Sequence, residues 1–296
     1  MSGAQNGALV GALSRPGFEL IPMEGAIERT ADLPKGAKVA ISCSPAPGIE
    51  GTLSLGEELL ARGFEIVPHL AARLVADRAH LEEIVRRLED LGVSEIFVIG
   101  GDAREPVGRF SSAFGLLCAM ADVGHCFERV GIGGYPEGHP TIDDRTLNRA
   151  LLDKRPFATY IVSQMCFDPG AILDWVTDIR RLGIDLPVHV GIPGVVEWKK
   201  LLRISLKIGV GDSTRFLTKH ANLVTRFLKP GGYSPEGLVK ELAPYVGDRN
   251  YGIVGFHIYT FNQVQSTEDW RRRMLEPEGT GSGVGPPQRD RVGRVG

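Results

Sequence analysis

Eight short apolar segments recur along the chain, each rich in valine and isoleucine and apolar on both of its faces. Segments of this kind are typical of strands buried in a parallel sheet, whereas half-exposed strands alternate apolar and polar residues. The predicted strands cover residues 18–22, 38–44, 64–70, 94–102, 129–135, 159–165, 187–194 and 251–261.

Helical patterns separate most of these strands, and the clearest of them cover residues 53–63, 77–92 and 168–183. Asp77 and Asp168 stand where helix-capping residues are expected, and each of the three segments closes on a glycine. Eight strands that alternate with helices predict an α/β protein folded as a (β/α)₈ or TIM barrel. An open doubly wound sheet is the alternative, but no Gly-x-Gly-x-x-Gly segment follows a strand.

The interval before the last strand is too long for one helix. Its pattern predicts three helices, at 195–209, 213–229 and 234–246, which together form a helical insertion at one side of the barrel mouth. Residues 1–16 and 276–296 show no periodicity and are expected to be disordered. The interpretation is therefore a single barrel domain at 17–275.

The amino-acid composition and net charge limit the kinds of binding partner that are expected. The 296 residues are 43% hydrophobic and 24% charged, as in ordinary globular domains, and the formal net charge is −2. That charge gives no electrostatic reason to expect nucleic acid or a membrane surface. No apolar run reaches the roughly 18 residues of a spanning helix, so we expect a cytoplasmic protein.

The four cysteines form no Cys-x-x-Cys pair, so they are expected to be reduced thiols and no metal site is predicted. In a (β/α)₈ barrel the functional residues stand where the strands end at the carboxyl face. Those positions carry many polar side chains here, which favours a ligand rich in hydrogen-bonding groups. They include Glu19, Ser42, Cys43, His69, Asp102, Tyr135, Glu137, His139, Gln164, His189, His257 and Tyr259.

Seven strand-end motifs resemble those of methylenetetrahydrofolate reductases, in the same order and at similar intervals. They are FELIP, VPHL, GGDAREP, GGYPEGHP, SQMCFD, GIPG and HIYTFN, which together span roughly residues 17–262. GYPEGHP and the glutamine motif followed by Phe-Asp are the most specific. The resemblance implies reduction of the methylene carbon of methylenetetrahydrofolate to methyl, with NADH or NADPH as electron source and FAD as hydride carrier.

The resemblance also implies roles for individual residues. Glu19 matches the glutamate that acts as general acid and opens the five-membered folate ring, a role that suits a carboxyl group whose pKa burial raises toward neutral. Glu24 is the alternative acid. Asp102 matches an aspartate beside the flavin and the pterin, and is expected to be catalytic and to contact the cofactor. Gln164 matches the glutamine that pairs with the pterin through its amide.

The remaining site residues are expected around the ligands. Tyr259 is expected to bind the substrate, and the cofactor-contacting residues are predicted to be His69, Gly101, Asp102, Tyr135 and His139. His189 and His257 are open to either an inward-facing or a structural role.

Two departures from the family pattern bear on FAD. Gly100 and Gly101 stand where flavin-dependent members carry Arg-Gly, and the basic residues after Tyr135 fall out of register with those that reach the FAD diphosphate. Losing such cations weakens a diphosphate site. Direct hydride transfer from the nicotinamide, without a flavin, is therefore an open alternative.

Two other functions stay open from the sequence. One is a folate-binding or pterin-binding barrel of the corrinoid-dependent methyltransferase type, although no corrinoid-binding motif is present. The other is a non-catalytic regulatory relative, which the joint presence of Glu19, Asp102 and Gln164 disfavours. A homo-oligomer is compatible with the sequence but not determined by it.

Overall fold

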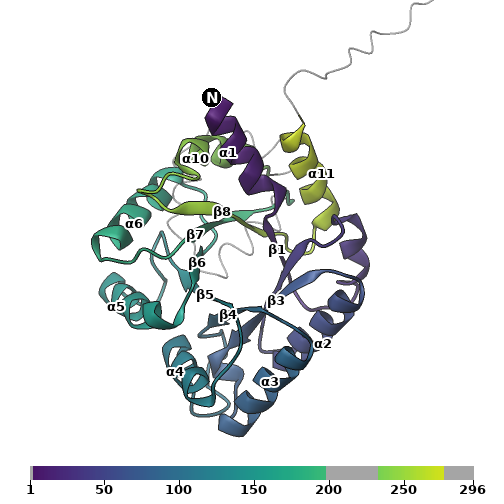
Figure 1. Cartoon of the computed structure of the whole chain (residues 1–296), viewed down its shortest axis with the longest axis vertical. Coiled ribbons are helices and arrows are strands. Elements are labelled where there is room, and N and C mark those ends of the chain that lie inside the picture. The colour runs from purple at the N-terminus through teal and green to yellow at the C-terminus, as the bar shows by residue number, and fades with distance from the viewer. Residues whose placement is uncertain (1–2, 198–232, 277–296) are drawn as a thin grey trace, which may run out of the picture.

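The computed structural model describes residues 3–197 and 233–276, with side chains from residue 6 onward. Eight parallel strands close into a barrel in sequence order (Figure 1). They are β1 (Gly17–Leu20), β2 (Lys38–Ile41), β3 (Glu65–Ala71), β4 (Glu95–Ile99), β5 (Arg129–Gly134), β6 (Tyr160–Ser163), β7 (Val188–Pro193) and β8 (Ile253–Tyr259). All eight predicted strands are confirmed, with ends displaced by a few residues.

The barrel closes where β8 pairs with β1. Gly17 is level with His257, and Glu19 is level with Tyr259. Glu19 is also level with Ala40 on the neighbouring β2. This register places the predicted general acid beside the motif of the last strand, 238 residues further along the chain.

Helices surround the strands as an outer ring (Figure 1). They are α1 (Gly3–Ser14), α2 (Gly48–Ala61), α3 (Arg78–Asp90), α4 (Ala113–Val123), α5 (Asp144–Lys154), α6 (Pro169–Arg181), α10 (Glu236–Leu242) and α11 (Val264–Leu275). Short 3₁₀ turns lie at η1 (Glu28–Asp32), η2 (Ala72–Leu74), η3 (Arg155–Phe157) and η4 (Ala243–Tyr245).

The predicted helix starts and stops at α3 and α6 are confirmed. The carboxylates of Asp77 and Asp168 accept hydrogen bonds from backbone N–H groups in the first turns of these helices. Gly92 and Gly183 follow the two helices with positive φ, as a closing glycine does. Helix α2 begins at 48, five residues before the prediction, because Ile49 continues its buried face.

The helical insertion can be compared with the structure only in part. Its third predicted helix is confirmed as α10 and η4. Most of 195–209 and all of 213–229 lie outside the described residues, as do residues 277–296. Within the described part of the first segment, Val196 forms a bridge with Tyr233 instead of a helical turn.

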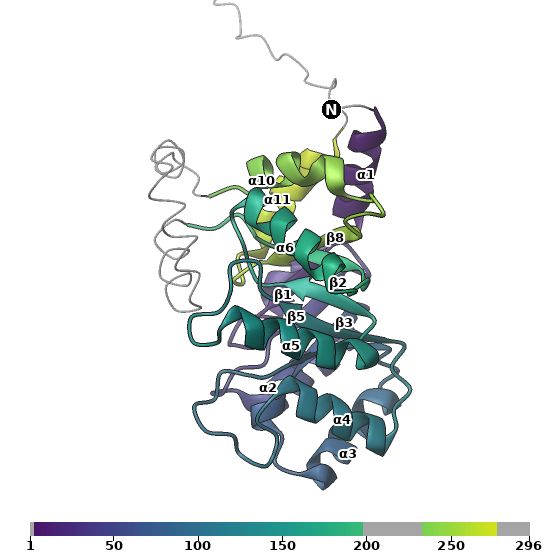
Figure 2. The ribbon, with the colours of Figure 1, turned by 90° about the vertical axis from the view of Figure 1, so that its left-hand side faces the viewer.

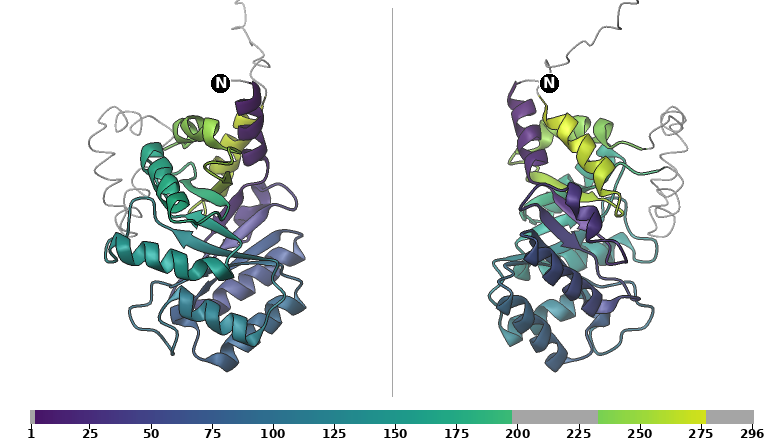
Figure 3. Two further views of the ribbon diagram at one scale, coloured as in Figure 1. Left: turned by 60° about the vertical axis from the view of Figure 1, so that its left-hand side comes forward. Right: turned by 90° about the vertical axis from the view of Figure 1, so that its right-hand side faces the viewer.

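The expected disorder of residues 1–16 is wrong, because residues 3–14 form helix α1. Leu9 and Leu13 are buried, and Arg271 of α11 donates a hydrogen bond to the Leu13 carbonyl at the end of α1. Figure 2 and both views of Figure 3 show α1 beside α11. The helix is ordered by these tertiary contacts, since its own residues carry almost no amphipathic pattern.

The main hydrophobic core lies between the strands and the helix ring. A second, much smaller apolar cluster lies inside the barrel and consists of Ala40, Val67, Phe97, Tyr160 and Val162. Most other inward positions carry glycine or polar side chains, so the barrel interior has room for ionisable groups below the mouth.

Candidate active site

The ends of β1 and β8 are joined by a set of hydrogen bonds that holds Glu19. The hydroxyl of Thr260 donates to the Glu19 carbonyl at 2.6 Å. The side chain of Asn262 accepts from the Ile21 N–H at 2.8 Å and donates to the Ile21 carbonyl at 2.9 Å. Asn262 has φ of 59°, a left-handed conformation that asparagine tolerates better than most residues. The HIYTFN motif therefore fixes the backbone from the Glu19 carbonyl to Ile21, directly after the side chain of the predicted acid.

The carboxyl group of Glu19 lies inside the barrel mouth, with its side chain 14% exposed. Its Oε2 is 2.9 Å from Nε2 of His257, which is the donor when the carboxylate is ionised. Burial raises the pKa of Glu19, but the hydrogen bond from His257 and the nearby His69 and His257 lower it more, so the net pKa lies below its ordinary value. The expected rise toward neutral is therefore wrong for the unliganded protein, where Glu19 is a carboxylate.

Two histidines pack beneath Glu19. The rings of His69 and His257 are stacked with centroids 6.4 Å apart. Burial lowers the pKa of His69 to about 4, so this imidazole is neutral near pH 7. Because β3 continues past His69 to Ala71, His69 lies in the barrel interior and is only 5% exposed. This placement does not support the expected contact between His69 and a cofactor at the mouth.

Tyr259 and Gln164 lie next to each other at the mouth. The Tyr259 hydroxyl donates to the Ser163 carbonyl at 3.2 Å, immediately before Gln164. Gln164 accepts from the Met165 N–H through Oε1 at 2.8 Å. Within residues 3–197 and 233–276 its amide N–H groups donate to no protein acceptor, so they are oriented by the Oε1 bond and available to a ligand. Gly191 makes this arrangement fit, because a Cβ there would lie 2.8 Å from the Tyr259 ring.

Asp102 lies close enough to Tyr135, and Tyr135 close enough to Tyr259, to interact with it electrostatically. Burial and the Asp102 carboxylate raise the pKa of Tyr135. Burial, Glu19 and Tyr135 together raise the pKa of Tyr259. These electrostatic couplings bring Asp102, Tyr135, Tyr259 and Glu19 into one continuous group, from four different strands or their following loops.

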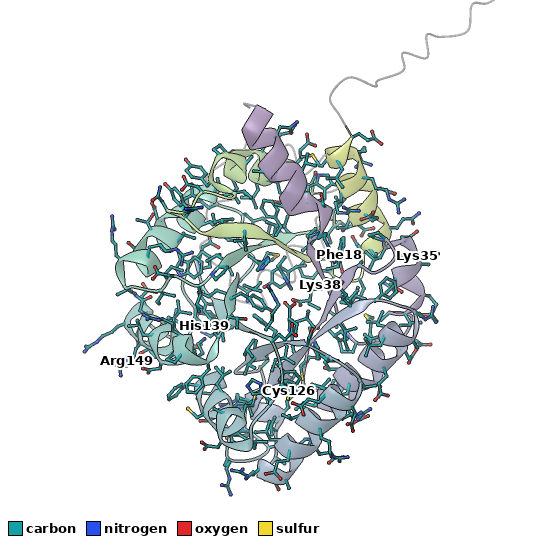
Figure 4. All side chains as sticks on the ribbon, viewed as in Figure 1. Phe18, Lys35, Lys38, Cys126, His139 and Arg149 are labelled. Carbon is teal, nitrogen blue, oxygen red and sulfur yellow. The ribbon has the colours of Figure 1, made fainter. Side chains whose placement is uncertain are left out.

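His139 extends this group outward. Its ring packs edge-on against Tyr135 with centroids 5.4 Å apart, and its Nδ1 accepts from the Thr141 N–H. That bond makes Nε2 the ring nitrogen that carries the proton. Figure 4 shows His139 near α5.

The loop after β4, which presents Asp102, is held by Arg73. The Arg73 guanidinium donates to the carbonyls of Ala103 and Arg104, each at 2.6 Å. Gly101 has φ of 92°, and a Cβ there would lie 2.9 Å from the Cβ of Ala71. Gly101 is therefore required by the packing of this loop, a reason independent of any cofactor.

The first turn of α5 bears on an FAD diphosphate, because the helix follows the Tyr135 loop. It begins with Asp143 and Asp144, two carboxylates at the helix end that otherwise attracts phosphate. Lys154 is buried and its Nζ donates to the Gly133 carbonyl. Arg149 pairs with Asp153 and extends away from the strands (Figure 4). These residues do not fit a diphosphate.

Sequence reasoning missed four contributors to this site. His257 was open to a structural role, and Thr260, Asn262 and Arg73 were given no role of their own. For His257 the period of two along β8, shared with Tyr259, was the available signal. The other three act through backbone groups of a distant strand or loop, so no local pattern reveals them.

Two features are absent from residues 3–197 and 233–276, a metal-binding cluster and a membrane-spanning helix. No group of three or more histidine, cysteine, aspartate or glutamate side chains there could hold a metal ion. None of the helices in these ranges is long and apolar enough to cross a membrane.

Comparison with known proteins gives one family. The sequence model of the family described as methylenetetrahydrofolate reductase matches residues 49–221 of this chain. Methylenetetrahydrofolate reductase (NADH) 1 of Arabidopsis thaliana is 27% identical over 211 residues, which cover 63% of this chain and 34% of that protein. The Zea mays protein of the same name is 27% identical over 214 residues, with the same coverage.

A shorter match is methylenetetrahydrofolate reductase 1 of Schizosaccharomyces pombe. It is 31% identical over 90 residues, which cover 30% of this chain and 15% of that protein. The chain thus spans about a third of the length of the plant relatives that it matches.

Proposed function

The chain belongs to the methylenetetrahydrofolate reductase family, and we propose that it reduces 5,10-methylenetetrahydrofolate to 5-methyltetrahydrofolate with NADH or NADPH, or catalyses the reverse reaction. The observation that carries this proposal is the carboxyl group of Glu19, held at the barrel mouth by Thr260 and hydrogen-bonded to His257. The plant relatives named for NADH support NADH as a donor to test first.

The reaction needs one proton and one hydride. The proton is transferred to a nitrogen of the five-membered ring, the bond from that nitrogen to the methylene carbon breaks, and an iminium forms. The hydride then adds to the methylene carbon and gives the methyl group. Glu19 is the proposed proton donor, since it is an ionisable side chain buried at the mouth, and the backbone that follows it is fixed by hydrogen bonds to Thr260 and Asn262.

The low pKa of Glu19 sets a condition on this role. In the unliganded protein the carboxylate is favoured by the bond from His257. A folate that covers the mouth excludes water, and desolvation disfavours the ionised carboxylate. The acid form is therefore expected only after folate binds, which protects the carboxyl proton from exchange at the mouth until it is used.

Contacts to the two ligands are proposed from the arrangement of the mouth. The amide N–H groups of Gln164 and the ring of Tyr259 would contact the pterin, together with the Asp102 carboxylate. Tyr135 and His139 would contact the nicotinamide nucleotide, because they form the outer side of the same group.

FAD, expected as the hydride carrier, needs cations or a free helix start for its diphosphate. Asp143, Asp144 and the engaged Lys154 provide neither around α5. We therefore derive no step through a flavin, and the hydride is proposed to pass directly from the nicotinamide to the methylene carbon. This requires both ligands at the mouth together, with C4 of the nicotinamide against the methylene carbon.

The test is turnover by the purified chain. NADH and NADPH are supplied separately with methylenetetrahydrofolate, the fall in nucleotide absorbance is followed, and the folate product is identified by mass. Formation of 5-methyltetrahydrofolate in step with nucleotide oxidation supports the proposal. Neither oxidation nor product, with and without added FAD, would reject the reductase function. Methyl transfer that depends on an added corrinoid protein would favour the methyltransferase alternative instead.

A further inference from the structure

The amino-terminal half of the barrel interior is unusually open and polar. Barrel interiors are normally filled by layers of branched apolar side chains. Here glycines make room for imidazoles: a Cβ at Gly17 would lie 3.3 Å from Nδ1 of His257, and one at Gly255 would lie 3.1 Å from Nδ1 of His189. Each glycine lies level with its histidine on a neighbouring strand, so a small residue stands beside a large one in both places.

A cavity of about 50 Å³ occupies this half of the interior. At roughly 15 Å³ for each water, it has room for about three waters. It is lined at one end by Arg15 and Lys38, whose side chains are 81% and 30% exposed. At the other end it is lined by His69 and His257, which are almost completely buried. The cavity therefore runs from the amino-terminal rim to His257, whose ring is hydrogen-bonded to Glu19.

His69 and His257 form the inner wall of the cavity. Nε2 of His69 is buried without a hydrogen-bond partner among the described residues, and it is closed off from the cavity because almost none of its surface is accessible. Nδ1 of His257 lies beside the cavity residue Gly17. Cavities that are polar and large enough hold water, so the water inside the barrel lies against the His257 ring.

We propose that this cavity is a proton entry route from the amino-terminal rim of the barrel to Glu19, with water in the cavity and with His257 as the last carrier. The proposal rests on the proposed function, because the reduction consumes one proton from solvent in each turnover. It also explains how Glu19 is protonated while both ligands cover the mouth.

The final transfer moves one proton through the His257 ring to Glu19. A hydronium ion that enters the cavity from solvent gives a proton to Nδ1 of His257 and becomes water, and the N–H bond at Nε2 breaks as an O–H bond forms at Oε2 of Glu19. The imidazole is neutral before and after, and the carboxylate becomes a carboxylic acid. Glu19 then gives this proton to the folate nitrogen. Nε2 is the ring atom bound to Glu19, and Nδ1 lies beside the cavity residue Gly17.

The charges along the route are balanced. At the rim, Arg15 pairs with Glu65, and Lys38 and Arg129 both pair with Glu95. With Glu19 at the inner end, the charged groups comprise three of each sign. Tyr160 beside Glu95 stays a neutral phenol, because burial and Glu95 raise its pKa well above the ordinary value.

Two histidines on the walls, His69 and His189, are neutral near pH 7. Burial lowers the pKa of His69 to about 4, and the pKa of His189 is also about 4, with burial as the largest cause. Neither imidazole therefore holds a positive charge that would repel a proton near pH 7. The ionised Glu19 attracts the proton inward.

The first experiment needs no catalysis. In the ligand-free protein, the exchange of the His257 Nε2 proton with solvent is measured by NMR with ¹⁵N-labelled histidine. Val67→Phe fills the cavity and Gly17→Ala shields Nδ1 of His257, while Gly133→Ala is the matched control, an inward glycine that does not line the cavity. Exchange should slow about tenfold or more in the first two variants and stay within about twofold in the control.

Unchanged exchange in both cavity variants would overturn the proposal, because the proton would then reach His257 from the mouth. Gly17→Ala, which adds a single methyl group, provides the result if Val67→Phe does not fold. The exchange measurement gives its result whether or not the chain is a reductase. Failure of the proposed function would be seen separately, as absence of turnover in the wild-type assay.

The second experiment uses turnover over a pH range. If the route supplies Glu19, Gly17→Ala should lower kcat about tenfold above pH 7, where protons are scarce, with little change in KM for either substrate. The loss should be smaller at low pH, and a merely structural defect would not follow pH in this way. A kcat equal to that of the wild type across the range would overturn the role in catalysis.

Discussion

Replacing Asn262 by alanine tests how the end of β8 positions Glu19. The Asn262 side chain is buried, and it is bonded to both backbone polar groups of Ile21, two residues after Glu19. Alanine removes both bonds and has no polar group to replace them. It also has to adopt the left-handed φ of 59° that Asn262 has in the structure.

The expected loss of stability follows from these contacts. Each hydrogen bond contributes about 1 kcal/mol net, and the Ile21 groups are only partly buried, so water can satisfy them in part. The left-handed backbone costs alanine about 1 kcal/mol more than it costs asparagine, whose short polar side chain favours this conformation. The free energy of unfolding should therefore fall by about 3 kcal/mol.

Activity should fall further than stability alone explains. The Thr260 bond to the Glu19 carbonyl remains, but the strand end beyond it is released, and small displacements of a reacting group can cost on the order of a hundredfold. Urea denaturation at a pH near 7 gives the stability, and turnover well below the unfolding midpoint gives kcat.

Two controls separate the contributions. Asn262→Gly keeps the left-handed backbone at no steric cost, so it should lose about 2 kcal/mol instead of about 3. Asn262→Asp keeps the acceptor for the Ile21 N–H but loses the donor to the Ile21 carbonyl, so its loss should be smaller. An alanine variant as stable and as active as wild type would refute the reasoning.

Four further outcomes are expected. Glu19→Gln should lower the rate of folate reduction by about 10²–10⁴-fold with the fold intact. Glu24 is exposed, so Glu24→Gln should leave the rate unchanged. Equal activity in the two variants would remove Glu19 as the acid. Gln164→Ala should weaken folate binding by about 1–3 kcal/mol in a titration, and unchanged affinity would leave it a structural role. In the folded protein the pKa of His69 is about 4, below the ordinary 6.5. The contribution of the neutral His69 to stability is therefore complete above about pH 6.5 and is lost as the pH falls toward 4. Urea midpoints should therefore fall less between pH 7 and 5 in His69→Leu than in wild type, and equal falls would contradict this pKa. An absorption spectrum of the purified protein should lack flavin bands in the blue, and a yellow preparation that loses activity with its flavin would restore FAD as the carrier.

The sequence by itself determined the barrel and most of its mouth. Parallel strands buried on both faces are apolar throughout, so they can be found without knowing their neighbours, and the caps at Asp77 and Asp168 act within one helical turn. The strand ends then name Glu19, Asp102, Tyr135, Gln164 and Tyr259, because the parallel topology brings all of them to one face.

Only the tertiary structure decided what depends on distant contacts. Helix α1 is ordered by α11, and its own sequence shows no amphipathic stripe from which it could be predicted. The state of Glu19 is another case: burial raises its pKa as expected, but His257 lies opposite because β8 closes the barrel against β1. His69 stands at the end of its motif but inside the barrel, since β3 continues past it. Local pattern reports on burial and chain direction, whereas ionisation and the interior cavity depend on which strands become neighbours when the sheet closes.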